Sequence, residues 1–264
     1  MGDLLPEDGR RAFGRDPAAY DQSRPDYPDA VFERLSGLLG PPPWHGFEIG
    51  PGGGLATRRL LRAGAAPLLA VEPDARLAAY LAAAGHAELD VLNATFEAAD
   101  LAPGSFDLGV AATSLHWLDQ DLALAKAARL LKPGGWFCHF ANVFGDPGRQ
   151  DDFHDATQAL LSPLPKGPSG GGGPVPYALD RRARLDDLTR HFGEVVSDVW
   201  PWTLVLDSAG VRALYATFSN ITLLPEDQRE EVLDSLARIA EREFGGRVER
   251  NMVTAFYAGR RLPS

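Results

Sequence analysis

The sequence predicts an α/β protein whose doubly wound, mostly parallel sheet of seven strands ends in an antiparallel strand pair beside a small helical cap. Three observations predict this fold. Between residues 29 and 142, short apolar runs alternate with segments whose apolar residues recur at helical spacing. A glycine-rich turn follows the first of these runs, at 50–54. Two later stretches, 195–206 and 248–257, alternate apolar and polar side chains, which is typical of strands with one exposed face.

The N-terminal half of the chain carries the alternating pattern. Its first residues are polar and turn-rich as far as Pro28, and apolar residues at helical spacing then predict a helix over 29–39. Turn signals bound five short apolar runs that predict buried strands, over 44–49, 68–71, 89–92, 106–112 and 135–142. Helices are predicted over 74–84, which Asp74 can cap, and over 119–131. Strands separated by helices pair in parallel through right-handed crossovers.

The C-terminal half follows a looser pattern. Helical spacing predicts helices over 151–161, 185–191 and 224–244. A connection rich in proline and glycine, 162–176, lies between the first two of them. The two alternating stretches near the end of the chain are expected to pair as a hairpin-like unit.

Composition and charge argue against several classes of function. The 26 basic and 36 acidic residues give a net charge of −10, which disfavours a nucleic-acid surface. The single cysteine, Cys138, excludes an internal disulfide and a multi-cysteine metal site, and no histidine or carboxylate grouping has metal-ligand spacing. No apolar run approaches the ~20 residues of a membrane span, and the N-terminus lacks the order of a secretion signal. We therefore expect a cytoplasmic protein without metal, membrane or nucleic acid.

The strongest chemical signal is the glycine-rich turn that follows the strand predicted over 44–49. Glycines let the backbone bend sharply and approach a ligand closely, and the helix after the turn offers its first amides. The spacing Gly50-x-Gly52-x-Gly54 places Leu55 where a dinucleotide-binding turn has its third glycine. The absence of Gly-Lys-Ser/Thr excludes a nucleotide-binding P-loop.

Two carboxylates narrow the choice of ligand. Glu48 precedes the turn, where it disfavours a pyrophosphate and favours a cationic group such as an α-amino group or a sulfonium. Glu72 ends the second predicted strand, 22 residues after Gly50, where an acid accepts hydrogen bonds from ribose hydroxyls. This pattern favours S-adenosylmethionine and disfavours the alternative of nicotinamide-dependent oxidoreduction.

These residues resemble motifs of the class I S-adenosylmethionine-dependent methyltransferases, in particular the type 11 family of small-molecule enzymes. Five segments match family motifs in the right order: 20–28 (Tyr-x-x-x-Arg-Pro-x-Tyr-Pro), 48–54, 71–74, 105–108 and 131–135. The resemblance covers most of the chain and implies a Rossmann-like methyltransferase fold. It also implies transfer of a methyl group from S-adenosylmethionine to an oxygen, nitrogen or carbon atom of a small molecule, by in-line displacement.

The resemblance implies a set of cofactor-binding residues. The three glycines would line the methionine part, Glu72 would hold the ribose, and Tyr20 or Arg24 would meet the methionine carboxylate from an N-terminal lid. The adenine contact after the third strand falls on 93–97. The complete expected set is Tyr20, Arg24, Glu48, Gly50, Gly52, Gly54, Glu72, Pro73, Leu77, Asn93, Thr95, Phe96 and Thr113.

Acceptor-binding residues are expected after the fourth and fifth strands and in the second half of the chain. The candidates are Tyr27, His116, Trp117, Asn142, His154 and Trp200. His116 is the candidate general base, because a histidine titrates near neutral pH; packing is its alternative role. The aromatic residues Trp200, Trp202, Tyr215 and Phe218 either belong to a core or wall an apolar acceptor pocket.

The chain divides by this interpretation into four parts. They are an N-terminal lid with helices (1–40), a cofactor-binding α/β core (41–145), a helical cap with the loop rich in glycine and proline (146–193), and C-terminal strands and helices that complete the sheet (194–264). We expect a monomer or homodimer. An alternative function stays open: a relative that binds S-adenosylmethionine for a cyclisation, a rearrangement or ligand binding would carry the same motifs.

Overall fold

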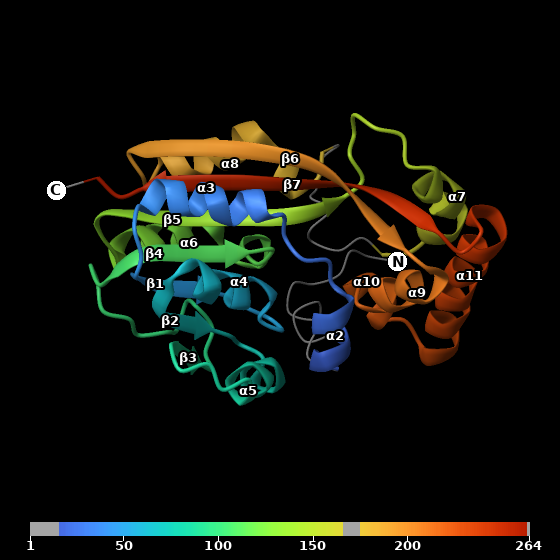
Figure 1. The fold of residues 1–264 in the computed structure, drawn as a ribbon, viewed down its shortest axis with the longest axis horizontal. Helices are drawn as coiled ribbons and strands as arrows, with labels where there is room; N and C mark the ends of the chain where they lie inside the picture. Colours follow the sequence, from blue (N-terminus) through green and yellow to red (C-terminus); the bar gives the residue numbers. More distant parts are fainter. Residues whose placement is uncertain (1–15, 166–174, 263–264) are drawn as a thin grey trace.

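The computed structural model describes residues 16–165 and 175–262, so part of the predicted connection 162–176 lies outside the described residues. Seven strands form one mixed sheet in the order β3-β2-β1-β4-β5-β7-β6 (Figure 1). The strands are β1 (Trp44–Ile49), β2 (Ala65–Val71), β3 (Leu89–Leu92), β4 (Phe106–Ala112), β5 (Leu131–Phe144), β6 (Glu194–Leu206) and β7 (Val248–Arg260).

The pairing of these strands confirms the predicted fold class. The first five strands pair in parallel, and β7 pairs antiparallel with both β5 and β6. The predicted C-terminal pair therefore exists, but β6 and β7 are not a hairpin. Helices that follow β6 separate it from β7 in sequence, and β7 lies between β5 and the edge strand β6.

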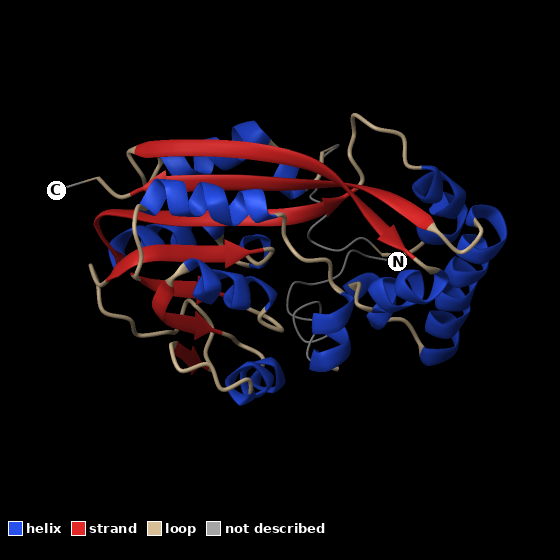
Figure 2. Ribbon diagram, in the orientation of Figure 1, coloured by secondary structure: helices blue, strands red, loops and turns tan. Residues whose placement is uncertain are grey.

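Helices cover both faces of the sheet and one of its ends (Figure 2). They are α2 (Pro17–Ser23), α3 (Asp29–Leu39), α4 (Leu55–Ala63), α5 (Ala75–Ala83), α6 (Gln120–Leu130), α7 (Asp152–Leu161), α8 (Arg181–Thr189), α9 (Ser208–Ala216), α10 (Ser219–Thr222) and α11 (Glu226–Phe244). One hydrophobic core lies between α3, α4 and the sheet, and a second lies between α6, α8 and the opposite face. None of the helices in the described residues has the length and apolar character that a membrane crossing requires.

A third core lies beyond the end of the sheet and holds together four helices, α7, α9, α10 and α11, which are called the cap from here on. Its buried side chains come from α7, α9, α10 and α11 and include Phe153, Ile221 and Leu236. A buried ion pair joins this cap to the sheet. The Arg250 guanidinium on β7 donates to both carboxylate oxygens of Asp151, at 3.1 and 2.9 Å, and also to the Tyr215 hydroxyl on α9. All three side chains are buried.

Four helices differ from the predicted pattern. Neither α2 nor the pair α9 and α10 is predicted by apolar spacing, and α8 begins at Arg181, before the predicted start at 185. Helix α2 buries no side chain completely, so it lacks the periodic apolar face that reveals longer helices. Its start is marked locally, because Asp16 caps the helix and Pro17 occupies its first turn.

Candidate active site

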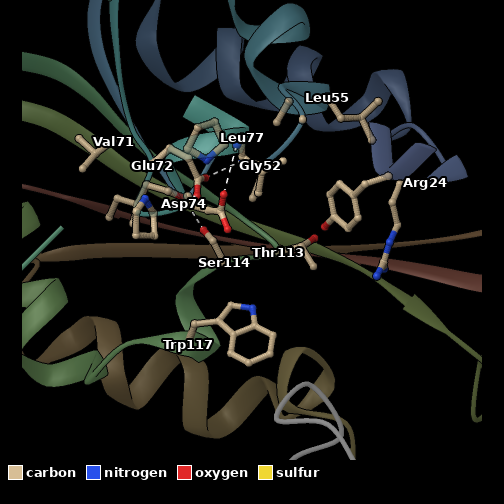
Figure 3. Close-up of a pocket in the computed structure, with 18 of the residues that line it drawn as sticks. Arg24, Gly52, Leu55, Val71, Glu72, Asp74, Leu77, Thr113, Ser114 and Trp117 are labelled. Atoms are coloured by element: carbon tan, nitrogen blue, oxygen red, sulfur yellow. Dashed lines mark hydrogen bonds between the residues drawn. The ribbon is translucent and has the colours of Figure 1, made fainter. Parts of the chain in front are cut away.

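One cavity of about 620 Å³ opens at the carboxyl ends of β1, β2 and β4, beneath α2 (Figure 3). Ligands of doubly wound sheets bind at this edge. The lining includes thirteen residues that the sequence predicts for the site. They are Tyr20, Arg24, Tyr27, Gly50, Gly52, Glu72, Pro73, Leu77, Thr95, Phe96, Thr113, Trp117 and Asn142.

The glycine turn is shaped by left-handed backbone conformations. The φ angles of Gly50, Gly52 and Gly54 are 62°, 58° and 87°, a region that side chains rarely allow. A Cβ atom at Gly50 would also lie 2.9 Å from the Cβ of Ser114, whose hydroxyl donates to the Ile49 carbonyl. Gly54 does not line the cavity as expected: a Cβ there would lie 2.5 Å from Leu81, so this glycine serves packing.

Glu72 ties the glycine turn to the end of β2. Its carboxylate accepts from the Gly52 amide at 3.0 Å and from the Asp74 amide at 2.9 Å. Only 4% of Glu72 is exposed, and burial raises the pKa of its carboxyl against the opposing effect of these two amides. Asn93 supports the same segment from outside the cavity, because its amide donates to the carbonyl oxygens of Glu72 and Pro73. Asn93, which is expected to contact the adenine, therefore does not line the cavity.

Glu48 does not line the cavity. Its side chain is completely buried and accepts a hydrogen bond of 2.6 Å from the Thr57 hydroxyl on α4, while its second oxygen has no partner in the described structure. Burial raises the pKa of the Glu48 carboxyl to about 7. The expected direct contact with a cationic ligand is replaced by a contact with the first helix after the turn. The sequence could not assign the side of the strand on which this carboxyl lies.

Glu48 makes the stability of the protein depend on pH. Its pKa of about 7 in the folded protein exceeds the ordinary value of 4.5, so stability falls as pH rises through this interval. We expect Glu48→Gln to gain about 2–3 kcal/mol in the free energy of unfolding relative to wild type between about pH 5 and about pH 8. Urea unfolding at both pH values measures this gain. The buried histidines titrate in both proteins, so their effect cancels in the difference between the two free energies of unfolding. If those free energies change with pH by the same amount in both proteins, the prediction is wrong.

The far end of the cavity is apolar and is held by a lysine. Leu77, Thr95 and Phe96 line it, and the Phe96 ring stacks on Phe47 at 5.8 Å between ring centroids. The ammonium group of Lys126 on α6 donates to the carbonyl oxygens of Phe96 and Ala99, each at 2.5 Å. This lysine fixes the turn that carries Thr95 and Phe96.

Helix α2 closes the near side of the cavity and is tied to α4 and α5. Asp21 forms an ion pair of 2.7 Å with Arg58 and accepts from the Tyr80 hydroxyl at 3.2 Å. The helix lies directly on the glycine turn, because a Cβ atom at Gly53 would come within 2.7 Å of the Asp21 Cβ. The sequence motif identified this segment but did not identify Asp21 as its anchor.

Arg24, at the end of α2, presents a cation to the cavity. One terminal nitrogen donates to the Thr217 carbonyl at 2.9 Å, and the guanidinium carbon lies 5.2 Å from the Tyr20 ring centroid and 5.1 Å from that of Phe218. Its Nε atom is buried and has no hydrogen-bond partner. In the described parts of the chain, no carboxylate forms an ion pair with Arg24.

A pair of hydroxyl groups lies between the 24–27 segment and β4. The Tyr27 and Thr113 hydroxyls are 2.8 Å apart, and burial raises the pKa of Tyr27 well above its usual value, so Tyr27 remains neutral. Thr113 has a φ angle of 53°, which branched residues rarely adopt. Backbone strain of this kind gathers at functional sites. Trp117, four residues further on, faces the same cavity (Figure 3).

Three predicted acceptor-binding residues lie outside the cavity. His116 turns away and packs on Trp117 and Tyr177, and burial lowers its pKa to about 4. His154 on α7 contacts Gln158 at the surface. Trp200 on β6 packs on Phe256 with 5.9 Å between ring centroids. Conversely, the set of site residues predicted from the sequence lacks several that line the cavity, among them Asp21, Leu55, Asp74, Ser114, Leu118 and Phe144.

Solved structures share this fold. A candidate type II methyltransferase from Anaeromyxobacter dehalogenans aligns with a TM-score of 0.65 and 22% identity, over 91% of this chain and 99% of the other. Phosphoethanolamine N-methyltransferase 2 of Haemonchus contortus, solved with phosphomonomethylethanolamine and S-adenosylhomocysteine, aligns with a TM-score of 0.53 and 13% identity, over 98% and 57% of the two chains.

Two sequence relatives each match about half of the chain. An uncharacterized methyltransferase of Mycobacterium tuberculosis is 33% identical over 124 residues, which are 47% of this chain and 49% of that protein. Dimethylglycine N-methyltransferase of Parasynechococcus marenigrum is 33% identical over 155 residues, 56% of this chain and 52% of that protein. The chain thus spans about half the length of these curated relatives.

The family model described as a methyltransferase domain matches residues 47–139, from β1 into β5. The fold and the glycine turn therefore define a class I S-adenosylmethionine-dependent methyltransferase domain. Within that class, residues 47–139 match the type 11 methyltransferase family, as the sequence motifs predicted. The cofactor of this domain is S-adenosylmethionine.

Proposed function

We propose that this protein transfers the methyl group of S-adenosylmethionine to a small-molecule acceptor. One observation carries the proposal: a single cavity brings together the glycine turn bound by Glu72 and the Arg24 guanidinium, which has no ion pair in the described parts of the chain. A nucleoside with an amino-acid tail needs both features, because its ribose requires a hydrogen-bond acceptor and its carboxylate requires a cation.

The side chains present fit this cofactor. Glu72 would accept hydrogen bonds from the ribose, and Leu77 and Phe96 would contact the adenine. The buried Nε of Arg24 would donate to the methionine carboxylate, which supplies the partner that this atom lacks. When bound, the cofactor supplies a methyl group on a positively charged sulfur atom.

The acceptor would meet the methyl group on the side of Tyr27, Thr113 and Trp117. Within residues 16–165 and 175–262 no histidine lines the cavity. The acceptor atom would therefore attack through a lone pair that is already available, without a histidine base to remove a proton from it. Catalysis would then rest on holding that atom in line with the methyl group. The name of one relative, dimethylglycine N-methyltransferase, favours an acceptor nitrogen. His116 would serve packing under this proposal.

Arg24→Met is expected to weaken the binding of S-adenosylhomocysteine about 10- to 100-fold, because a hydrogen bond between charged groups contributes about 1.5–3 kcal/mol. Binding of 5′-methylthioadenosine, which lacks the amino-acid part, should not change. Isothermal titration calorimetry measures both affinities. The control is Arg34→Met, which removes an arginine paired with Asp198 away from the cavity.

Two results would count against the proposal. If the wild-type protein does not bind S-adenosylhomocysteine at millimolar concentration, the cavity is not a cofactor site. If it binds the compound but never transfers a labelled methyl group to a panel of amines, phenols and acids, the alternative of a non-methylating relative is favoured.

A further inference from the structure

A line of hydrogen bonds crosses three strands and ends at the segment that forms the cavity wall. The Trp202 indole on β6 donates to the Thr254 hydroxyl on β7 at 2.9 Å. That hydroxyl donates to the Asn142 side-chain oxygen on β5 at 2.7 Å. The Asn142 amide then donates to the carbonyl oxygens of Pro25 and Asp26, at 3.3 and 3.2 Å.

The direction of this line is fixed by chemistry. An indole N–H can only donate, so the Thr254 oxygen accepts from Trp202 and its single hydrogen is left for Asn142. The oxygen of the Asn142 amide therefore faces Thr254, and its NH₂ group faces the 25–26 carbonyls. Thr254 is completely buried, so water does not compete for its hydroxyl. The indole donor on the edge strand and the two carbonyl acceptors of residues 25–26 thus favour the same orientation of the Asn142 amide.

Strand register brings the three side chains together. Asn142 and Thr254 are direct partners in the pairing of β5 with β7, and Thr254 is the partner of Trp200 in the pairing of β7 with β6. Trp202 follows two residues later on the same face of β6, at the diagonal distance that a long side chain can span.

This series of hydrogen bonds ends at the backbone between two residues of the cavity wall. Pro25 and Asp26 separate Arg24 from Tyr27, so the Asn142 amide holds the backbone from which both side chains project. The side chains of Arg24 and Tyr27 are also held by hydrogen bonds, with the Thr217 carbonyl and with the Thr113 hydroxyl respectively. The amide holds the middle of a segment whose two ends are fixed elsewhere.

We propose that Trp202, Thr254 and Asn142 position Arg24 through this line of hydrogen bonds, which begins at Trp202, outside the cavity. These three residues are called the relay. This inference rests on the proposed role of Arg24 toward the cofactor carboxylate. It changes the expected role of Asn142 from contact with the acceptor to support of the 24–27 segment. It also gives Trp202 a role other than walling an acceptor pocket.

Two pairs of variants separate the relay from packing. Trp202→Phe removes the donor, whereas Trp200→Phe removes the same atoms two residues earlier on β6. In the parts of the chain that the structure describes, the Trp200 indole donates no hydrogen bond to the protein. Thr254→Val removes the hydroxyl with little change in shape, and Thr254→Ser retains it.

The binding of S-adenosylhomocysteine and of 5′-methylthioadenosine is measured by calorimetry for each variant. We expect Trp202→Phe and Thr254→Val to weaken S-adenosylhomocysteine binding about three- to tenfold, as loss of a neutral hydrogen bond does. Binding of 5′-methylthioadenosine should stay unchanged, because it has no carboxylate for Arg24. Trp200→Phe and Thr254→Ser should retain the wild-type ratio of the two affinities, and thermal melts confirm that each variant folds.

The outcomes distinguish this inference from the function on which it rests. If wild type binds S-adenosylhomocysteine and Trp202→Phe leaves the ratio unchanged, the relay is wrong and the proposed function stands. Equal weakening of both compounds, or equal effects of Trp200→Phe and Trp202→Phe, assigns Trp202 to packing and also overturns the relay. If wild type binds neither compound, the proposed function fails and the relay fails with it.

Discussion

Replacing Arg250 by methionine is expected to lower the free energy of unfolding by about 3–5 kcal/mol. Arg250 is 2% exposed and donates to both oxygens of the buried Asp151 carboxylate. Burial alone would raise the pKa of Asp151, but Arg250 and two backbone amides hold it below its ordinary value. Without the guanidinium, a carboxylate would remain buried without its cation. Urea denaturation at neutral pH measures the loss.

A nearby arginine gives the matched control for this prediction. Arg247 also pairs with a carboxylate, that of Glu249, but the two side chains are 63% and 55% exposed. Exposed pairs contribute little to stability, so Arg247→Met should leave the urea midpoint where it is in wild type. Similar losses in the two variants would show that burial of the Arg250 pair does not determine its contribution.

Glu72→Ala is expected to weaken S-adenosylhomocysteine binding about 100-fold or more. The carboxylate holds the Gly52 and Asp74 amides, and hydrogen bonds to a charged group contribute about 1.5–3 kcal/mol each. The proposed bonds from the two ribose hydroxyls to this carboxylate correspond to at least about 3 kcal/mol of binding free energy, and loss of the two amide bonds also loosens the glycine turn. Calorimetry measures the affinity, and Glu72→Gln should fall between alanine and wild type because it keeps one acceptor oxygen.

Asp90→Ala tests whether this loss is specific to the site. Asp90 is an exposed carboxylate on β3, beside the strand that precedes Glu72, and it does not line the cavity. Its removal should leave the affinity unchanged. Wild-type affinity in Glu72→Ala would place the nucleoside elsewhere in the molecule.

Local signals in the sequence were sufficient for most of the fold. Apolar runs and N-cap aspartates such as Asp74 mark elements from neighbouring residues alone, and β1, β3 and β4 have the predicted bounds. The position of β7 between β5 and β6 depends on pairing between distant segments, which no local pattern encodes. The short helices α9 and α10 acquire their buried faces only through the cap core.

The candidate site divides in the same way. Gly50, Gly52 and Glu72 could be predicted because a turn conformation and a strand end are local properties. Glu48 and His116 could not be placed, because a side chain at the end of a strand or in a short turn can face either side of the sheet. The relay could not be predicted either, since its members come from β5, β6 and β7 and meet only through register.

The interior position of β7 also constrains the order in which a growing chain can fold. β6 pairs with β7 and with no other strand of the described sheet, yet β7 is made only after α9, α10 and α11. When β6 has left the ribosome, its partner strand β7 has not yet been synthesised. By contrast, β1 to β5 can already pair with one another. Newly made β6 therefore has no partner strand until β7 has been synthesised, and a chain that stops before Val248 would leave β6 without a place in the sheet.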